Sequence, residues 1–122
     1  MDCDKIESHM KRDMPNIPNY IPYIQRHEFE ALLFTNLKGF DYVIDDPKKL
    51  SDVNKVITKY DNPEDINGGS DTAPSKRLEN IFSYKKTFHS IIILSEISID
   101  EIRSKCPRFN AWVDTLLTYN YR

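Results

Sequence analysis

Apolar positions recur at helical spacing along most of the chain, which predicts a protein dominated by helices. Ile6, Met10 and Met14 follow each other at i, i+4 and i+8, so a short amphipathic helix is expected over residues 4–14, before Pro15. Asp46 and Pro47 are typical of the start of a second helix. The apolar face of that helix is expected to consist of Leu50, Val53, Ile57 and Tyr60.

Helical patterning returns after a polar loop rich in Asn, Gly, Asp and Pro over residues 61–74. A helix is expected from Ser75, and the apolar content of Tyr84–Ile97 favours a buried helix. Ser98 with Glu101 forms a capping-box pattern for the next helix. Pro107 is expected to start the last helix. The side chains predicted to form the core are Phe29, Leu33, Ile92, Phe109, Trp112 and Leu116.

The segment Ile21–Ile24 differs from the rest because it is short, β-branched and aromatic, which is typical of a buried strand. The good helix formers that follow predict a helix through Phe34. We therefore expect a helix-dominated α+β fold with about five or six helices and one strand. An unpaired strand exposes backbone hydrogen-bonding groups, so we expect a dimer or a swapped assembly.

Composition narrows the class of protein. A length of 122 residues with 39% hydrophobic and 30% charged residues fits a single domain over residues 1–122, or a fragment of a longer domain. A net charge of -2 does not indicate nucleic-acid binding by bulk charge. No apolar run approaches the length of a membrane span. Cys3 and Cys106 do not form a CxxC pair, so a reduced, cytoplasmic protein is expected.

The best candidates for chemistry lie where the predicted strand turns into a helix. His27, Glu28 and Glu30 are the polar side chains at this junction, a usual place for a site in an α/β layer. Acidic residues are also favoured in the first turn of any helix, and His27 also suits the surface or a satisfied buried position. Glu30 lies between Phe29 and Ala31, and burying its carboxylate there requires a specific partner.

A second candidate group is basic. Ser75, Lys76 and Arg77 begin a predicted helix, where cations oppose the helix dipole and where a phosphate is readily bound. Solvated lysines and an arginine paired with Glu79 or Asp71 are the alternative. No Ser-His-Asp arrangement, phosphate-binding loop, HExxH or CxxC pattern is present.

Several segments resemble, in order and spacing, a bacterial family known as domain of unknown function 4276. The matching segments are Pro22–Phe34, Glu64–Asn67, Thr72–Leu78, Tyr84 with Lys86, and Cys106–Leu116. Members look like relatives of the Toprim fold, which binds a divalent metal through an early glutamate and a later pair of aspartates. No counterpart of those strands is found here, so the resemblance implies the C-terminal part of a Toprim-like domain.

The resemblance also implies a function: metal-dependent cleavage of nucleic acid in bacterial phage defence, alongside an ATPase partner. It assigns Glu30 to the active site and the metal, with Glu28 second, and Lys76 and Lys86 to phosphate. His27 remains a catalytic candidate, and Ser75 and Arg77 remain phosphate-binding candidates, because of their positions in the sequence. Magnesium is the expected cofactor of the full-length protein. This chain offers one or two of the carboxylates that such a site needs, so it is expected to be inactive alone and to bind no metal tightly. The alternative is a non-catalytic interaction or assembly module.

Overall fold

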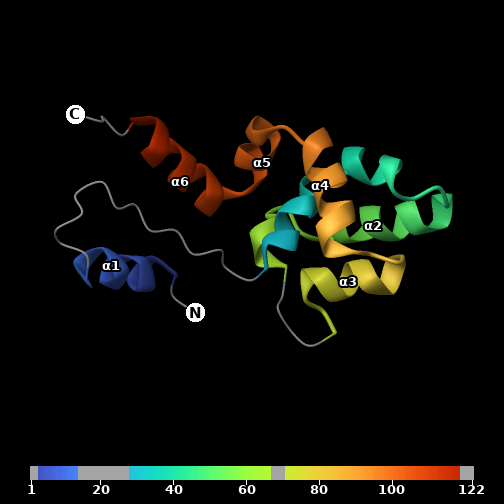
Figure 1. Ribbon diagram of the computed structural model, residues 1–122, viewed down its shortest axis with the longest axis horizontal. Helices are drawn as coiled ribbons and strands as arrows, with labels where there is room; N and C mark the ends of the chain where they lie inside the picture. The colour runs from blue at the N-terminus through green and yellow to red at the C-terminus, as the bar shows by residue number, and fades with distance from the viewer. Residues whose placement is uncertain (1–2, 14–27, 67–70, 119–122) are drawn as a thin grey trace.

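The computed structural model describes residues 3–13, 28–66 and 71–118. Within these ranges the chain forms six α-helices and three short 3-10 helices. The elements are α1 (Cys3–Asp13), η1 (Phe29–Thr35), η2 (Lys38–Tyr42), α2 (Pro47–Lys59), η3 (Pro63–Asp65), α3 (Pro74–Ile81), α4 (Lys86–Glu96), α5 (Ile99–Lys105) and α6 (Pro107–Thr118). Helices α2, α3 and α4 gather at one end of the molecule, whereas α6 and α1 lie at the other (Figure 1).

The expectation of an α+β fold with a strand is wrong. Every regular element of the described ranges is helical, and those ranges contain no strand, so this part of the chain is all-α. The segment Ile21–Ile24, to which the strand was assigned, lies outside the described residues. The physical reason is that a run of four apolar residues is too short for its periodicity to identify a strand.

Local capping explains where two of the helices, α2 and α5, begin. The Asp46 carboxylate accepts a hydrogen bond from the Lys48 N–H at 2.9 Å, directly before Pro47. The Ser98 hydroxyl accepts one from the Glu101 N–H at 3.1 Å at the start of α5. Both predicted helix starts are therefore confirmed. Each cap supplies an acceptor for a backbone donor that has no partner within its own helix.

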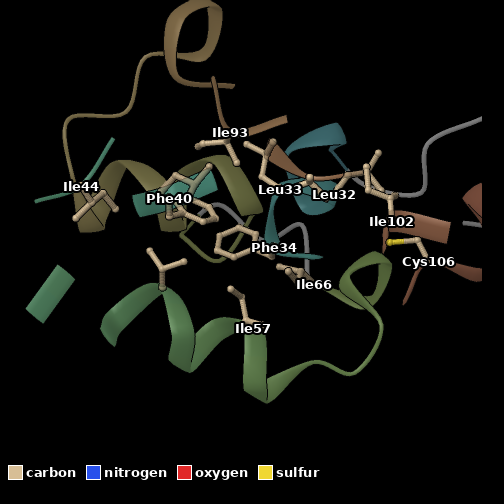
Figure 2. Close-up of a cluster of buried hydrophobic side chains, with 13 residues drawn as sticks. Leu32, Leu33, Phe34, Phe40, Ile44, Ile57, Ile66, Ile93, Ile102 and Cys106 are labelled. Atoms are coloured by element: carbon tan, nitrogen blue, oxygen red, sulfur yellow. The ribbon is translucent and has the colours of Figure 1, made fainter. Parts of the chain in front are cut away.

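The core is built around η1, which contacts α2, α3, α4 and α5. All residues from Glu30 to Thr35 are buried, although a 3-10 helix of seven residues is unusually long. Figure 2 shows Leu33, Phe34 and Phe40 among side chains from the surrounding helices. Because packing covers every side of η1, the polar side chains at its start are held against neighbouring helices.

The predicted core is largely wrong. Of the six side chains expected in it, only Leu33 is fully buried, whereas Phe29, Ile92, Phe109, Trp112 and Leu116 are half-buried. Helix α6 contains no buried residue and packs mainly against α5 at the edge of the molecule. The amphipathic pattern of α6 predicts an apolar face that lies in the core. In the described residues that face covers the outside of a core made by η1, η2 and α2–α5.

Candidate functional site

Glu28 lies directly before η1 and binds the start of a helix that is distant in sequence. Its carboxylate accepts hydrogen bonds from the Ser75 N–H and the Ser75 hydroxyl, both at 2.9 Å. Ser75 lies in the first turn of α3, whose own N-cap, Ala73, provides no side-chain acceptor. Glu28 therefore caps α3 from 47 residues away and occupies the place where an external anion would meet this helix end.

Glu30 is the most unusual side chain of the site. It is 1% exposed, and its Oε2 atom accepts a hydrogen bond from the Tyr84 hydroxyl at 3.1 Å. Lys86 Nζ lies 3.7 Å from the same oxygen and 4.9 Å from the centre of the Phe29 ring. The Oε1 atom of Glu30 is buried and has no hydrogen-bond partner among the described residues. The carboxylate thus has one anchored oxygen, Oε2, and one open oxygen, Oε1, where open means that no described residue donates a hydrogen bond to it.

Tyr84, in its protonated form, donates the hydrogen bond that anchors Oε2 of Glu30. Burial raises the pKa of the Tyr84 hydroxyl, and the adjacent Glu30 carboxylate raises it further because a tyrosinate there would repel it. The ring also stacks on His89, with centroids 6.1 Å apart. Tyr84 therefore acts as a fixed hydrogen-bond donor that orients Glu30.

Lys86 is the exposed member of the same group. Its side chain is 63% exposed although its ammonium lies near a buried carboxylate. A lysine side chain with this exposure keeps its charge accessible to solvent. The ammonium is consequently able to meet an anion that approaches from outside while still interacting with Glu30.

The other predicted phosphate-binding residues lie along α3 and are engaged within the protein. Lys76 pairs with Glu79 at 3.2 Å on the surface. Arg77 donates to the Thr72 carbonyl at 2.6 Å and to the Tyr60 hydroxyl at 3.1 Å. The structure therefore brings Glu28 to Ser75 and Glu30 to Lys86, as two separate pairs. His27 lies outside the described residues.

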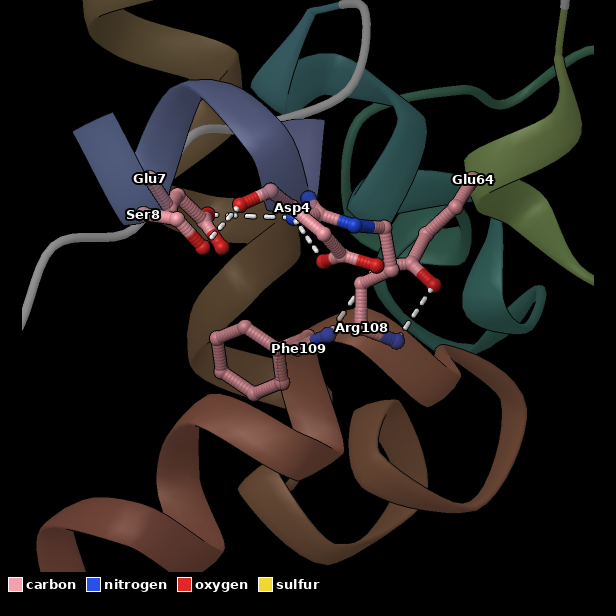
Figure 3. A network of polar contacts seen from close by, with 6 residues as sticks. All are labelled: Asp4, Glu7, Ser8, Glu64, Arg108 and Phe109. Atoms are coloured by element: carbon pink, nitrogen blue, oxygen red, sulfur yellow. Dashed lines mark hydrogen bonds and ion pairs between the residues drawn. The ribbon is translucent and has the colours of Figure 1, made fainter. Parts of the chain in front are cut away.

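Sequence reasoning assigned no role to Glu64, which is also 1% exposed. Its two oxygens accept hydrogen bonds from the Arg108 and Phe109 N–H groups, each at 3.0 Å (Figure 3). Glu64 therefore caps α6. The sequence signals that Glu64 has a role, because it lies in one of the segments that carry the family resemblance, but it does not indicate the start of α6 as its partner.

The cap at Glu64 also positions Arg108, whose side chain connects α6 to α1. Its guanidinium donates to Asp4 at 3.3 Å and to Glu7 at 3.0 Å (Figure 3). Burial raises the pKa of the neighbouring Cys106 thiol to about 12, and the Glu64 charge adds to this effect. This region is a structural junction in which every carboxylate oxygen of Glu64 has a donor.

The described residues contain no group of three or more His, Cys, Asp or Glu side chains that could hold a metal ion. Among their buried carboxylate oxygens, Oε1 of Glu30 has no hydrogen-bond partner in the described part of the chain. Further oxygen ligands for a divalent cation would have to come from elsewhere, because Mg²⁺ takes six. Among the described helices, none is long and apolar enough to cross a membrane.

Comparisons with known proteins complete the description of the site. Neither the search of curated proteins nor that of solved structures found a match. A family model does match, over residues 2–117, and its range includes Glu28, Glu30, Glu64 and Lys86. Because that range covers nearly the whole chain, the protein belongs to the family described as Domain of unknown function (DUF4276).

Proposed function

We propose that this chain contributes part of the active site of a Toprim-like, metal-dependent protein that cleaves nucleic acid in bacterial defence. The observation that carries the proposal is the open Oε1 atom of Glu30, a carboxylate oxygen that is buried yet has no donor among the described residues. A buried acceptor without a donor costs about 1–3 kcal/mol or more. A ligand or ion that binds this oxygen is one explanation of such a cost.

The residues around Glu30 suit this chemistry. Tyr84 fixes one oxygen, so the other keeps a defined direction. Glu30 would contribute that oxygen to a magnesium ion whose remaining ligands come from other residues and water, and the ion would supply charge stabilisation for phosphodiester hydrolysis. Lys86, at 63% exposure, would contact the phosphate. Nucleic acid is then the substrate, with an ATPase as the partner protein.

The experiment compares two buried glutamates in the full-length protein. Glu30→Gln should abolish Mg²⁺-dependent cleavage of nucleic acid and change the unfolding temperature little, because Tyr84 can still donate to the amide oxygen. Glu64→Gln is the matched control, since Glu64 is equally buried but caps α6. It should lower stability and retain cleavage in the folded fraction. A Glu30→Gln protein that cleaves at the normal rate refutes the proposal.

A non-catalytic assembly module is the second candidate. It is favoured by Glu28, since both of its oxygens bind Ser75 and neither is open toward a ligand. On this alternative, Glu30→Gln leaves partner binding intact, and a charge-reversed Lys86→Glu variant reduces it. A full-length protein without cleavage activity, combined with Lys86-dependent capture of the ATPase partner, would select the module.

A further inference from the structure

The exposed face of α4 carries large apolar side chains that nothing in the described residues covers. Phe88 and Ile91 are 61% and 64% exposed and lie three residues apart, so they project from the same side of the helix. The opposite side, with Ser90 and Ile93, is buried in the core. Exposed apolar side chains grouped on one side of a helix are typical of a protein–protein contact.

The charges at the two ends of α4 oppose its dipole. Lys85 and Lys86 stand at the N-terminal end and Glu96 at the C-terminal end. A cation at the first turn and an anion at the last turn each destabilise an isolated helix. Lys86 has Glu30 as a partner, but Lys85 and Glu96 make no ion pair within the described part of the chain. The helix alone therefore does not explain these two charges.

Lys85 is the N-cap of α4 and Glu96 is its last residue, so the two charges mark the two ends of the helix. They are eleven positions apart, which is about three turns of an α-helix and a separation of roughly 16 Å. Ile91 lies close to their midpoint. A second α4 laid antiparallel across the first would place each lysine opposite the glutamate of the other copy, with the apolar side chains between them.

The surface beside Glu96 is suited to receive that lysine. A pocket of about 410 Å³ is lined by Lys38, Asp41, Tyr42 and Glu96. Lys38 is paired with Glu101, whereas Asp41 and Glu96 have no ion pair among the described residues. The pocket therefore has two carboxylates that make no ion pair within the described residues. The Lys85 ammonium, which also makes none there, lies at the other end of the same helix.

We propose that α4 is the contact helix of a homodimer. Two copies pack α4 antiparallel about a two-fold axis near Ile91, and Lys85 of each copy meets Asp41 and Glu96 of the other. This symmetry pairs both opposed charges at once and also aligns the two helix dipoles antiparallel. Two helices bury a small area, so the dimer is weak, depends on concentration and loosens as salt increases.

Charge reversal on the whole chain tests the proposal, with sedimentation equilibrium as the measurement. Lys85→Glu and Glu96→Lys should each raise the dimer dissociation constant at least about tenfold, because symmetry creates two repulsive contacts per dimer. The combination of both substitutions should restore association. Failure of the double variant to recover would overturn the specific pairing.

An apolar test accompanies the charge test. Ile91→Asp should abolish the dimer, whereas Leu117→Asp, on α6 and 70% exposed, is the matched control and should leave association unchanged. Circular dichroism checks that each variant retains its helices. A wild-type chain that stays monomeric at all concentrations overturns the proposal and assigns the α4 face to a different protein. Equal loss of association in both aspartate variants also overturns it.

Discussion

Glu30 and Glu64 are equally buried, but they lie in two regions that differ in the hydrogen bonds given to the carboxylate. At the start of α6, both oxygens of Glu64 receive a backbone N–H, and the charge is used as a helix cap. Between η1 and α4, one oxygen of Glu30 accepts a hydrogen bond from the Tyr84 hydroxyl and lies 3.7 Å from the Lys86 ammonium. Its second oxygen has no donor among the described residues. Both side chains are 1% exposed.

The difference teaches that burial alone does not identify a functional carboxylate. A carboxylate whose oxygens are all satisfied contributes to folding, and its replacement is expected to cost stability. A carboxylate with an open oxygen already carries a desolvation cost in the folded state, so its replacement by an amide is expected to cost little. The two regions differ in the number of hydrogen-bond donors that each carboxylate oxygen receives from the described residues.

The largest expected effect is at the satisfied carboxylate. Glu64→Ala removes two charge-assisted hydrogen bonds from the start of α6, and should lower the free energy of unfolding by about 3 kcal/mol or more. Urea denaturation followed by circular dichroism measures this change. A loss below about 1 kcal/mol would show that solvent satisfies the α6 backbone equally well and would remove the contrast with Glu30.

A second variant disturbs only the Glu30 region. A Cβ at Gly39 would lie 2.5 Å from the Ile93 carbonyl oxygen and 2.7 Å from its Cα, and backbone atoms cannot rotate away. Gly39→Ala should therefore push η2 from α4 and destabilise by about 2 kcal/mol. Amide hydrogen exchange should show faster exchange in α4 than in α6. Equally faster amide exchange in α4 and α6 would contradict the view that the two regions are independent.

A smaller effect is expected when the donor to Glu30 is removed. Tyr84→Phe deletes one hydrogen bond and should lower the free energy of unfolding by about 1–2 kcal/mol. The pKa of Tyr84 is raised in the folded state, so its contribution is complete below the unfolded value near pH 10 and is lost as pH rises above it. Between pH 8 and 11, the unfolding temperature should therefore fall less steeply with pH for Tyr84→Phe than for the wild type.

The smallest effect on stability is expected at Lys86. Its side chain is 63% exposed and lies 3.7 Å from Glu30, so solvent screens the pair and Lys86→Met should change the free energy of unfolding by less than about 1 kcal/mol. The proposed function predicts that the same variant also has a lower affinity for nucleic acid and a flatter salt dependence of that affinity. A large loss of stability with unchanged affinity would make Lys86 a structural partner of Glu30.

Much of the local structure could be predicted because its causes are local. Asp46 and Ser98 cap helices through hydrogen bonds that span only two or three residues. The i, i+4 pattern of Ile6 and Met10 likewise matches α1. The pattern around Glu30 is also informative, because a carboxylate within a densely apolar segment needs a partner if it is buried. In the structure Glu30 is buried, and the Lys86 ammonium lies 3.7 Å away.

The sequence by itself determined that this chain is rich in helices, where several of them begin, and that Glu30 needs a partner. Only the tertiary structure decided which carboxylates cap helices and which one stays open. Glu28 meets Ser75 across 47 residues, and Glu64 meets Arg108 across 44. Those pairings depend on how η1 and η3 pack among the helices. A single sequence carries no signal of such distances, because the hydrogen bond forms only after the apolar core has brought both elements together.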